Sequence, residues 1–139
     1  MNITIIDGQG GQLGAQLVKE ISTQFQNVSL TAIGTNAVAT STMLKAGAKN
    51  AATGENSVIV ACRKSDVIIG PVGIVIADSL LGEITPKMAV AVGQADAVRI
   101  LIPMNKCDNL VAGVPNMNTK ALIDDAISKL SAIIAGSNT

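Results

Sequence analysis

The stretch IIDGQGGQLGAQLVKE, residues 5–20, decides the fold, because an apolar run, a glycine cluster and an amphipathic segment follow one another. The run Asn2–Asp7 is short, β-branched and followed by glycines, as expected of a strand buried on both faces. Beyond the glycines, apolar residues recur at helical spacing: Leu13, Leu17, Val18, Ile21 and Phe25. The stretch therefore predicts a strand, a tight turn and the start of a helix.

The same alternation continues along the chain. Further strands are predicted over 28–34, 66–70 and 97–103, and helices over 36–46, 72–81, from Pro86 with Thr85 as N-cap, and over 122–136. Residues 53–65 could hold a strand at 58–62, but their polar start and basic end favour a helix. The apolar segment 110–114 predicts one more strand, which could run antiparallel at the edge of the sheet.

Strands that alternate with helices predict a parallel sheet covered on both faces. We therefore expect an α/β protein, a three-layer α/β/α sandwich of Rossmann-like or flavodoxin-like type. Its sheet would contain about five strands, mostly parallel, with the last strand the candidate for an antiparallel direction. The length of 139 residues suits a single domain over 1–139.

Composition excludes several classes of function. Ten basic residues balance ten acidic ones, and Phe25 is the single aromatic, so we expect no nucleic-acid partner. Two cysteines without a CxxC motif, in a chain without histidine, do not predict a metal site. Glycines, Pro71 and Asp78 interrupt the apolar run 67–82, which is too short to span a bilayer, so no membrane partner is expected. The N-terminus lacks the pattern of a secretory signal, which favours the cytoplasm.

Ligands of open α/β sheets bind at the carboxyl ends of the strands. Small and polar residues follow each predicted strand: Asp7 and the loop Gly8–Gly14 after the first, Gly34, Thr35 and Asn36 after the second, Gly70, Pro71, Val72 and Gly73 after the third, and Met104, Asn105 and Lys106 after the fourth. We expect these residues to form the edge of a binding site.

The first loop has the clearest physical basis for binding. Gly8 and Gly10 would permit a tight turn and a close approach to a ligand, Gly11 adds conformational freedom, and Gly14 would let the helix pack close to the sheet. The free amides at the helix N-terminus favour an anion, and Asp7 would orient the loop or a ligand hydroxyl. The alternative is that these glycines serve only the sharp turn.

The loop departs from the dinucleotide fingerprint in two ways. Leu13 stands where GxGxxG requires its third glycine, so only a looser GxGxxxG pattern fits. Thr35 and Asn36 stand where an acidic residue would bind the ribose of NAD. NAD(P) or another nucleotide stays a candidate cofactor, and the wider expectation is a small phosphate-bearing molecule.

Two other features allow more than one interpretation. The segment Gly70–Gly73 could offer amides to a ligand, or it could only start a helix through Pro71. Asp78 lies in an apolar run, so its carboxylate should meet a donor, reach solvent or face a ligand. Whether the protein is an enzyme stays open: Asp78 or Glu83 with Lys106 could act in catalysis, but they form no recognised motif, and the chain has neither His nor Tyr.

Several stretches together resemble an uncharacterised family of short bacterial proteins, a domain-of-unknown-function family with a Rossmann-like fold. They are IDGQGG, IGTNAVATSTMLKAGA, ATGEN, DVIIGPVGIVIADSLLGEITPKMA and ILIPMNKC, and they cover most of residues 6–107. The resemblance implies the fold and brings no substrate, reaction or site residue.

Two functions follow as hypotheses. The first is a small protein that binds a nucleotide, a dinucleotide or another phosphate-bearing ligand at the carboxyl ends of the strands. The alternative is a homo-oligomeric structural or regulatory module without catalytic activity, suggested by a composition that is 48% hydrophobic with one aromatic.

Overall fold

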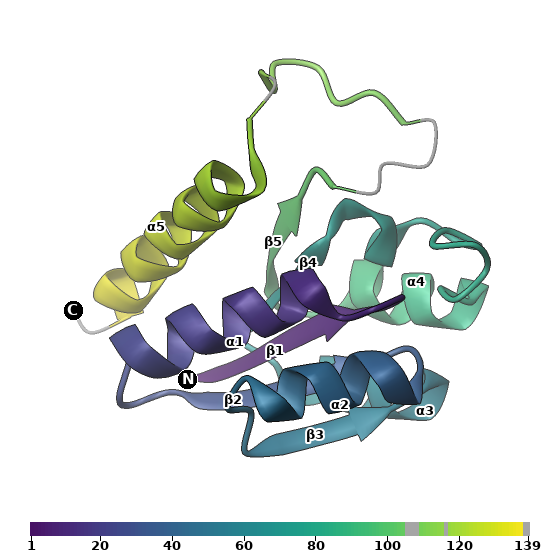
Figure 1. The fold of residues 1–139 in the computed structure, drawn as a ribbon, viewed down its shortest axis with the longest axis horizontal. Helices are drawn as coiled ribbons and strands as arrows, with labels where there is room; N and C mark the ends of the chain where they lie inside the picture. The colour runs from purple at the N-terminus through teal and green to yellow at the C-terminus, as the bar shows by residue number, and fades with distance from the viewer. Residues whose placement is uncertain (105–108, 116, 138–139) are drawn as a thin grey trace.

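The computed structural model describes residues 1–104, 109–115 and 117–137. Its elements alternate along the chain (Figure 1): β1 (Asn2–Asp7), α1 (Gln12–Gln24), β2 (Ser29–Gly34), α2 (Ala37–Lys45), β3 (Asn50–Thr53), α3 (Glu55–Lys64), β4 (Val67–Pro71), the 3-10 helix η1 (Val72–Val75), α4 (Pro86–Gln94), β5 (Val98–Ile102) and α5 (Thr119–Ser137). The five strands form one sheet in the order β3-β2-β1-β4-β5. Every pair of neighbouring strands is parallel.

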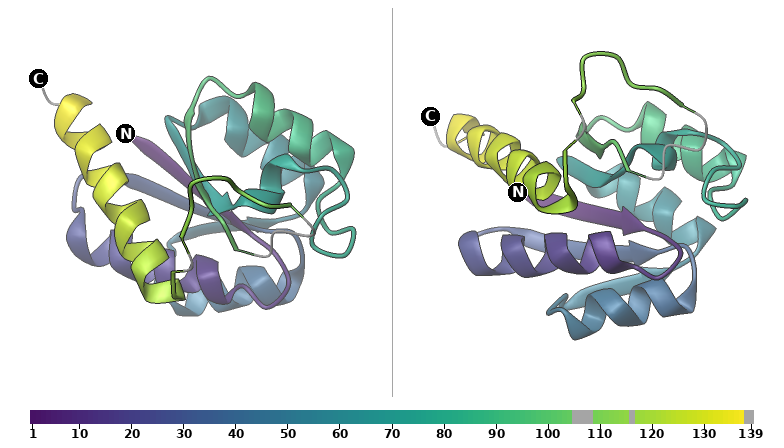
Figure 2. Two further views of the ribbon diagram at one scale, coloured as in Figure 1. Left: turned by 90° about the horizontal axis from the view of Figure 1, so that it is seen from above. Right: turned by 45° about the horizontal axis from the view of Figure 1, so that its top comes forward.

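The molecule has three layers, with helices on both faces of the sheet (Figure 2). Helices α1, α2 and α5 cover one face and enclose a core that includes Ile3, Ile5 and Leu17. Helices α3 and α4 cover the other face, over a second core that includes Ile6 and Ile68. The predicted three-layer α/β/α sandwich is therefore confirmed, and the strand order matches the first five strands of the Rossmann arrangement.

Local signals explain where several elements begin and end. Asn36 caps α2 by accepting a hydrogen bond from the Ala39 amide, and Thr85 caps α4, whose first residue is Pro86. The ambiguous segment 53–65 is largely helical, since α3 spans Glu55–Lys64. Glu55 in its first turn and basic residues in its last turn agree with the helix dipole.

Three expectations about the elements are wrong. The segment 109–115 contains no strand, so the strand expected at 110–114, with its possible antiparallel direction, is absent from the described part of the chain. The fifth strand is instead β3, which pairs with β2 at the edge of the sheet. The helix expected over 72–81 is the short η1 followed by turns, because Asp78, Leu80 and Leu81 adopt positive φ angles that end any right-handed helix.

This architecture brings the loops that follow β1 and β2 together at the carboxyl end of the sheet. The chain runs outward from β1 in both directions across the sheet, toward β2 and β3 on one side and toward β4 and β5 on the other. In sheets of this type ligands bind where the strand order reverses. Among the described helices, none is long and apolar enough to cross a membrane.

Candidate functional site

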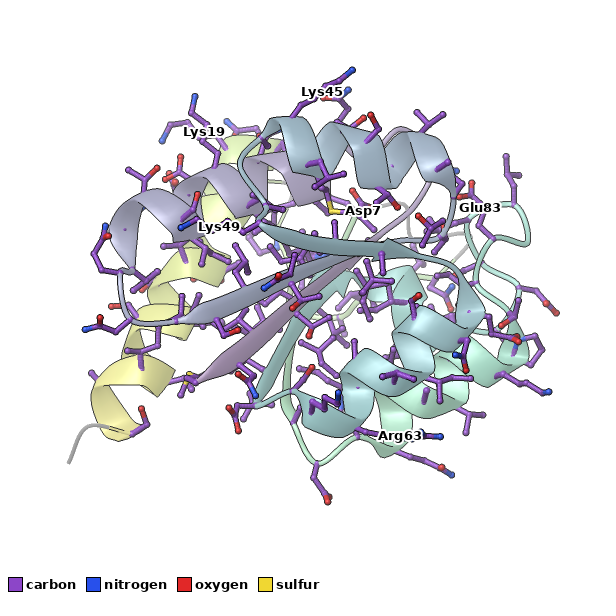
Figure 3. All side chains as sticks on the ribbon, turned by 90° about the horizontal axis from the view of Figure 1, so that it is seen from below. Asp7, Lys19, Lys45, Lys49, Arg63 and Glu83 are labelled. Carbon is purple, nitrogen blue, oxygen red and sulfur yellow. The ribbon has the colours of Figure 1, made fainter. Side chains whose placement is uncertain are left out.

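The candidate site is the group of loops at the carboxyl end of β1. The glycine loop 8–11 leaves β1 there, Thr35 and Asn36 follow β2, and the segment 76–85 returns to the same end after η1. We call the segment 76–85 the strap. Figure 3 shows Asp7 and Glu83 toward this end of the sheet, whereas the labelled lysines and Arg63 lie over other parts of the molecule.

Asp7 organises the glycine loop from inside the protein. The side chain is 4% exposed, and its two oxygens accept hydrogen bonds from the amides of Gly8 at 2.8 Å and Gly14 at 2.7 Å. Burial raises the pKa of the Asp7 carboxyl, the two amides act in the opposite direction, and the charge of Glu83 adds to the rise. Asp7 therefore closes the loop and caps the first turn of α1, a position that a bound anion could otherwise take.

Packing accounts for three of the four loop glycines. A Cβ atom at Gly8 would lie 2.6 Å from Thr35 Oγ1, and one at Gly14 would lie 2.9 Å from Asp7 Cβ. Gly11 has a φ of +76°, and its Cβ would lie 2.8 Å from the Ala39 backbone. Only Gly10 faces open space, with Gln12 Cγ at 4.0 Å. The interpretation of these glycines as architecture thus holds for Gly8, Gly11 and Gly14, and Gly10 is the position open to a ligand.

Three hydrogen-bond donors from two loops converge on one oxygen of Glu83. The Gln9 amide donates to Oε1 at 2.9 Å, the Thr35 hydroxyl at 2.7 Å and the Asn36 side-chain amide at 2.6 Å. Asn36 is fixed for this role, because its Oδ1 caps α2 and its Nδ2 also donates to the Gln9 carbonyl at 3.0 Å. The arrangement is a preformed position for an oxygen anion, occupied by the protein's own carboxylate.

These donors dominate the electrostatics of Glu83. Burial alone would raise the pKa of its carboxyl, but the bonds from Thr35, the Gln9 amide and Asn36 together hold the pKa below its usual value. Over residues 1–104, 109–115 and 117–137, ion pairs join only Lys120 to Asp124 and Lys129 to Asp125. Glu83 and Asp7 are therefore stabilised by hydrogen bonds and not by a described lysine or arginine.

Additional amides lie at the start of α1, directly after the glycine loop. In the described part of the chain, the backbone amides of Gly10, Gln12 and Leu13 donate to no protein acceptor. Free amides at a helix N-terminus attract negative charge through the helix dipole. The candidate site thus combines three donors held by Glu83 with backbone amides that have no described acceptor.

The other predicted site residues lie differently. Gly70 is inside β4, where a Cβ would lie 2.4 Å from the Ile6 carbonyl oxygen, so its role is close packing of strands. Gly73 lies in η1 and accepts a hydrogen bond from the buried Ser79 hydroxyl at 2.5 Å. Asp78 is exposed and reaches solvent. Asn105, Lys106 and Cys107 lie outside the described residues.

Glu83 is the residue that sequence reasoning did not place. In the sequence it stands 47 positions from Asn36, just after the falsely predicted helix 72–81, and it was named only as a catalytic candidate beside Lys106. The strap thus brings an acidic side chain to the residues that follow β2, by a contact that only the tertiary fold creates. The rarity of polar residues in the run 72–84 is the one signal that could have drawn attention to it.

A separate groove of about 640 Å³ lies between α3 and α4, away from the glycine loop. It is lined mainly by apolar atoms of residues such as Ile59, Val90 and Ala91, and Cys62 forms part of its floor. No three Asp, Glu or Cys side chains gather to hold a metal ion in the described part of the chain.

Comparison with known proteins places the chain in a family. Residues 2–135 match the domain of unknown function DUF3842, so the chain belongs to this family. No curated protein matches it. Among solved structures it is similar to a dodecameric FMN-dependent UbiX-like decarboxylase from Escherichia coli O157:H7, at 17% identity over 94% of this chain and 76% of that chain, with a TM-score of 0.45. A similarity this low carries no argument about function.

Proposed function

We propose that the chain binds a nucleotide or another small phosphate-bearing ligand at the carboxyl end of the sheet, against the glycine loop, Thr35 and Asn36. The observation that carries the proposal is the convergence of three donors, from two loops, on a single oxygen anion at the point where the strand order reverses. The unpartnered amides of Gln12 and Leu13 at the start of α1 adjoin this position and suit a second anionic oxygen.

The proposal is tested by thermal shift with nucleosides, nucleotides, dinucleotides and sugar phosphates. A ligand at about 100 times its Kd should raise the Tm by several degrees, since binding adds about 2.7 kcal/mol to stability. Compounds without phosphate should have no such effect.

Gly10→Val locates the response. This substitution fills the open space at Gly10, so the ligand-dependent shift should disappear. Gly93→Val is the matched control, because Gly93 also faces open space but lies in α4. The proposal fails if wild type shows no shift with any phosphate-bearing compound, or if both variants respond equally.

A second proposal, a homo-oligomeric module, is favoured by apolar side chains on the surface. Four apolar side chains are 48–65% exposed: Val38, Leu44, Val90 and Val98. Contact with another subunit would remove them from water. Sedimentation velocity checks this proposal. A single monomeric species at micromolar concentration would exclude it, and ligand binding at the glycine loop does not depend on the outcome.

A further inference from the structure

Glu83 holds the donors that an anionic ligand would need. Its Oε1 takes the Gln9 amide, the Thr35 hydroxyl and the Asn36 side-chain amide, all within 2.9 Å. A carboxylate oxygen and a phosphate oxygen make the same demand on such donors, namely short charge-assisted hydrogen bonds. A ligand phosphate and the Glu83 carboxylate therefore cannot use this position together.

The surroundings of Glu83 favour exchange for an outside anion. The Asp7 charge is close enough to interact with Glu83, and no described lysine or arginine pairs with either group. A phosphate added beside both carboxylates would meet repulsion, whereas a phosphate that replaces Glu83 leaves only Asp7, whose oxygens are already held by two amides.

The strap can keep its place when the Glu83 side chain leaves. Leu80 and Ile84 on either side are 1% and 0% exposed, and the Ser79 hydroxyl donates to the Gly73 carbonyl. The backbone amides of Asp78 and Ile84 close the strap on itself through the carbonyls of Ile84 and Ser79. Rotation of one side chain therefore frees the three donors without unfolding the strap.

We propose that Glu83 is a tethered occupant of the ligand site, which keeps the anion position closed until an anionic group of the ligand displaces its carboxylate. This inference rests on the proposed function and adds its regulation. A ligand with one anionic group can form only the hydrogen bonds that the Glu83 carboxylate loses when it leaves. A ligand with adjacent phosphates also gains the free amides of Gln12 and Leu13, so the tether selects for ligands with more than one anionic group.

The test is calorimetric titration of the full chain with inorganic pyrophosphate. Glu83→Gln removes the charge of the tether and keeps its shape, so pyrophosphate should bind about ten- to a hundredfold more tightly than to wild type, the range expected for lost charge-assisted hydrogen bonds. Asp78→Asn is the matched control, because it removes one negative charge from the same strap at an exposed position. Its Kd should stay within about twofold of the wild-type value.

Glu83→Asp separates the tether from simple charge repulsion. It keeps the charge but shortens the side chain, so the carboxylate no longer reaches the donors and pyrophosphate affinity should still rise. Thermal unfolding of each variant verifies that it is folded. If Glu83→Gln does not fold, the pyrophosphate affinity of Glu83→Asp tests the inference in its place.

Each other outcome overturns the inference. Weaker binding to Glu83→Gln would mean that Glu83 contacts the ligand directly, for example a ribose hydroxyl, and the proposed function would stand without the tether. Equal gains in Glu83→Gln and Asp78→Asn, with none in Glu83→Asp, would indicate general repulsion only. If pyrophosphate at millimolar concentration binds neither wild type nor any Glu83 variant, the tether is overturned, and the thermal-shift panel decides separately whether the proposed function also fails.

Discussion

Two adjacent glycines in one loop have opposite physical roles. Gly11 combines a φ of +76° with a predicted Cβ contact of 2.8 Å to the Ala39 backbone, whereas Gly10 meets only Gln12 Cγ at 4.0 Å. Gly11→Ala should therefore lower the free energy of unfolding by about 3 kcal/mol through backbone strain and overpacking. Gly10→Ala should change it by less than about 0.5 kcal/mol.

Urea denaturation of the two variants beside wild type measures this contrast. Similar losses in both would mean that the loop needs glycine flexibility in general, and would contradict the assignment of Gly10 as the position open to a ligand.

Cys62 should make stability depend on alkaline pH. Burial raises the pKa of its thiol from 9.0 to about 11, and the residue is 3% exposed. Between these pH values the unfolded chain has lost the thiol proton while the folded chain keeps it, so the contribution to stability is complete below pH 9 and is lost as pH rises toward 11. The loss should approach about 3 kcal/mol.

Unfolding free energies at pH 8.5 and 10.5 measure this loss, with Cys62→Ala as the reference that lacks the thiol. The difference between the two pH values should be larger in wild type. Equal pH dependence in both proteins would show that Cys62 is not desolvated as the structure indicates.

The role of a side chain was predictable from the sequence where its hydrogen-bond partners are close along the chain. Thr85 with Pro86 marked the start of α4 correctly, since a cap bonds to an amide only three residues away. Glu83 has its partners at Gln9, Thr35 and Asn36, and this distance along the chain left no local pattern. The glycines of the candidate site were therefore predictable, while the contact of Glu83 with Thr35 and Asn36 was not.

At the scale of elements, the strap shows that a segment without regular structure can belong to the core. Leu80 is 1% exposed and packs with Ile84 and Ile74, whereas its neighbour Leu81 is 94% exposed. Their φ angles are 55° and 56°, so substitution by alanine changes the conformational energy of the backbone equally at both positions. We expect Leu80→Ala to lower the free energy of unfolding by about 2–4 kcal/mol and Leu81→Ala by less than about 0.5 kcal/mol.

The midpoint of chemical denaturation distinguishes the two variants. If Leu80→Ala were as stable as wild type, the strap would not be anchored in the core, and the tether would lose its fixed base.

The missed strand β3 and the false helix at 72–81 have a common physical reason. The strand β3 has the sequence NAAT, whose small and polar residues carry no strand pattern, and only its pairing with β2 makes it a strand. The run 72–84 is apolar enough for a buried helix, but its apolar residues fill the core from turns. Long amphipathic helices and buried β-branched strands were predicted well, because their burial follows from periodicity.

At the scale of the whole molecule, strand order decides where chemistry can occur. Alternation in the sequence predicted parallel strands between helices, but the order β3-β2-β1-β4-β5 came only from the structure. That order brings the loops after β1 and β2 together, and the strap adds Glu83. The groove between α3 and α4 is the competing location for a ligand.

Nuclear magnetic resonance can compare these two locations in one experiment. In a titration of the uniformly nitrogen-15-labelled chain with the ligand from the thermal-shift panel, or with pyrophosphate, amide shift changes should concentrate at Gln9, Gly10, Gln12, Leu13, Thr35 and Asn36. The side-chain amide of Asn36 should also shift, because it loses Glu83 as acceptor. Changes confined to residues of the α3–α4 groove, or the absence of any saturable change, would contradict the account.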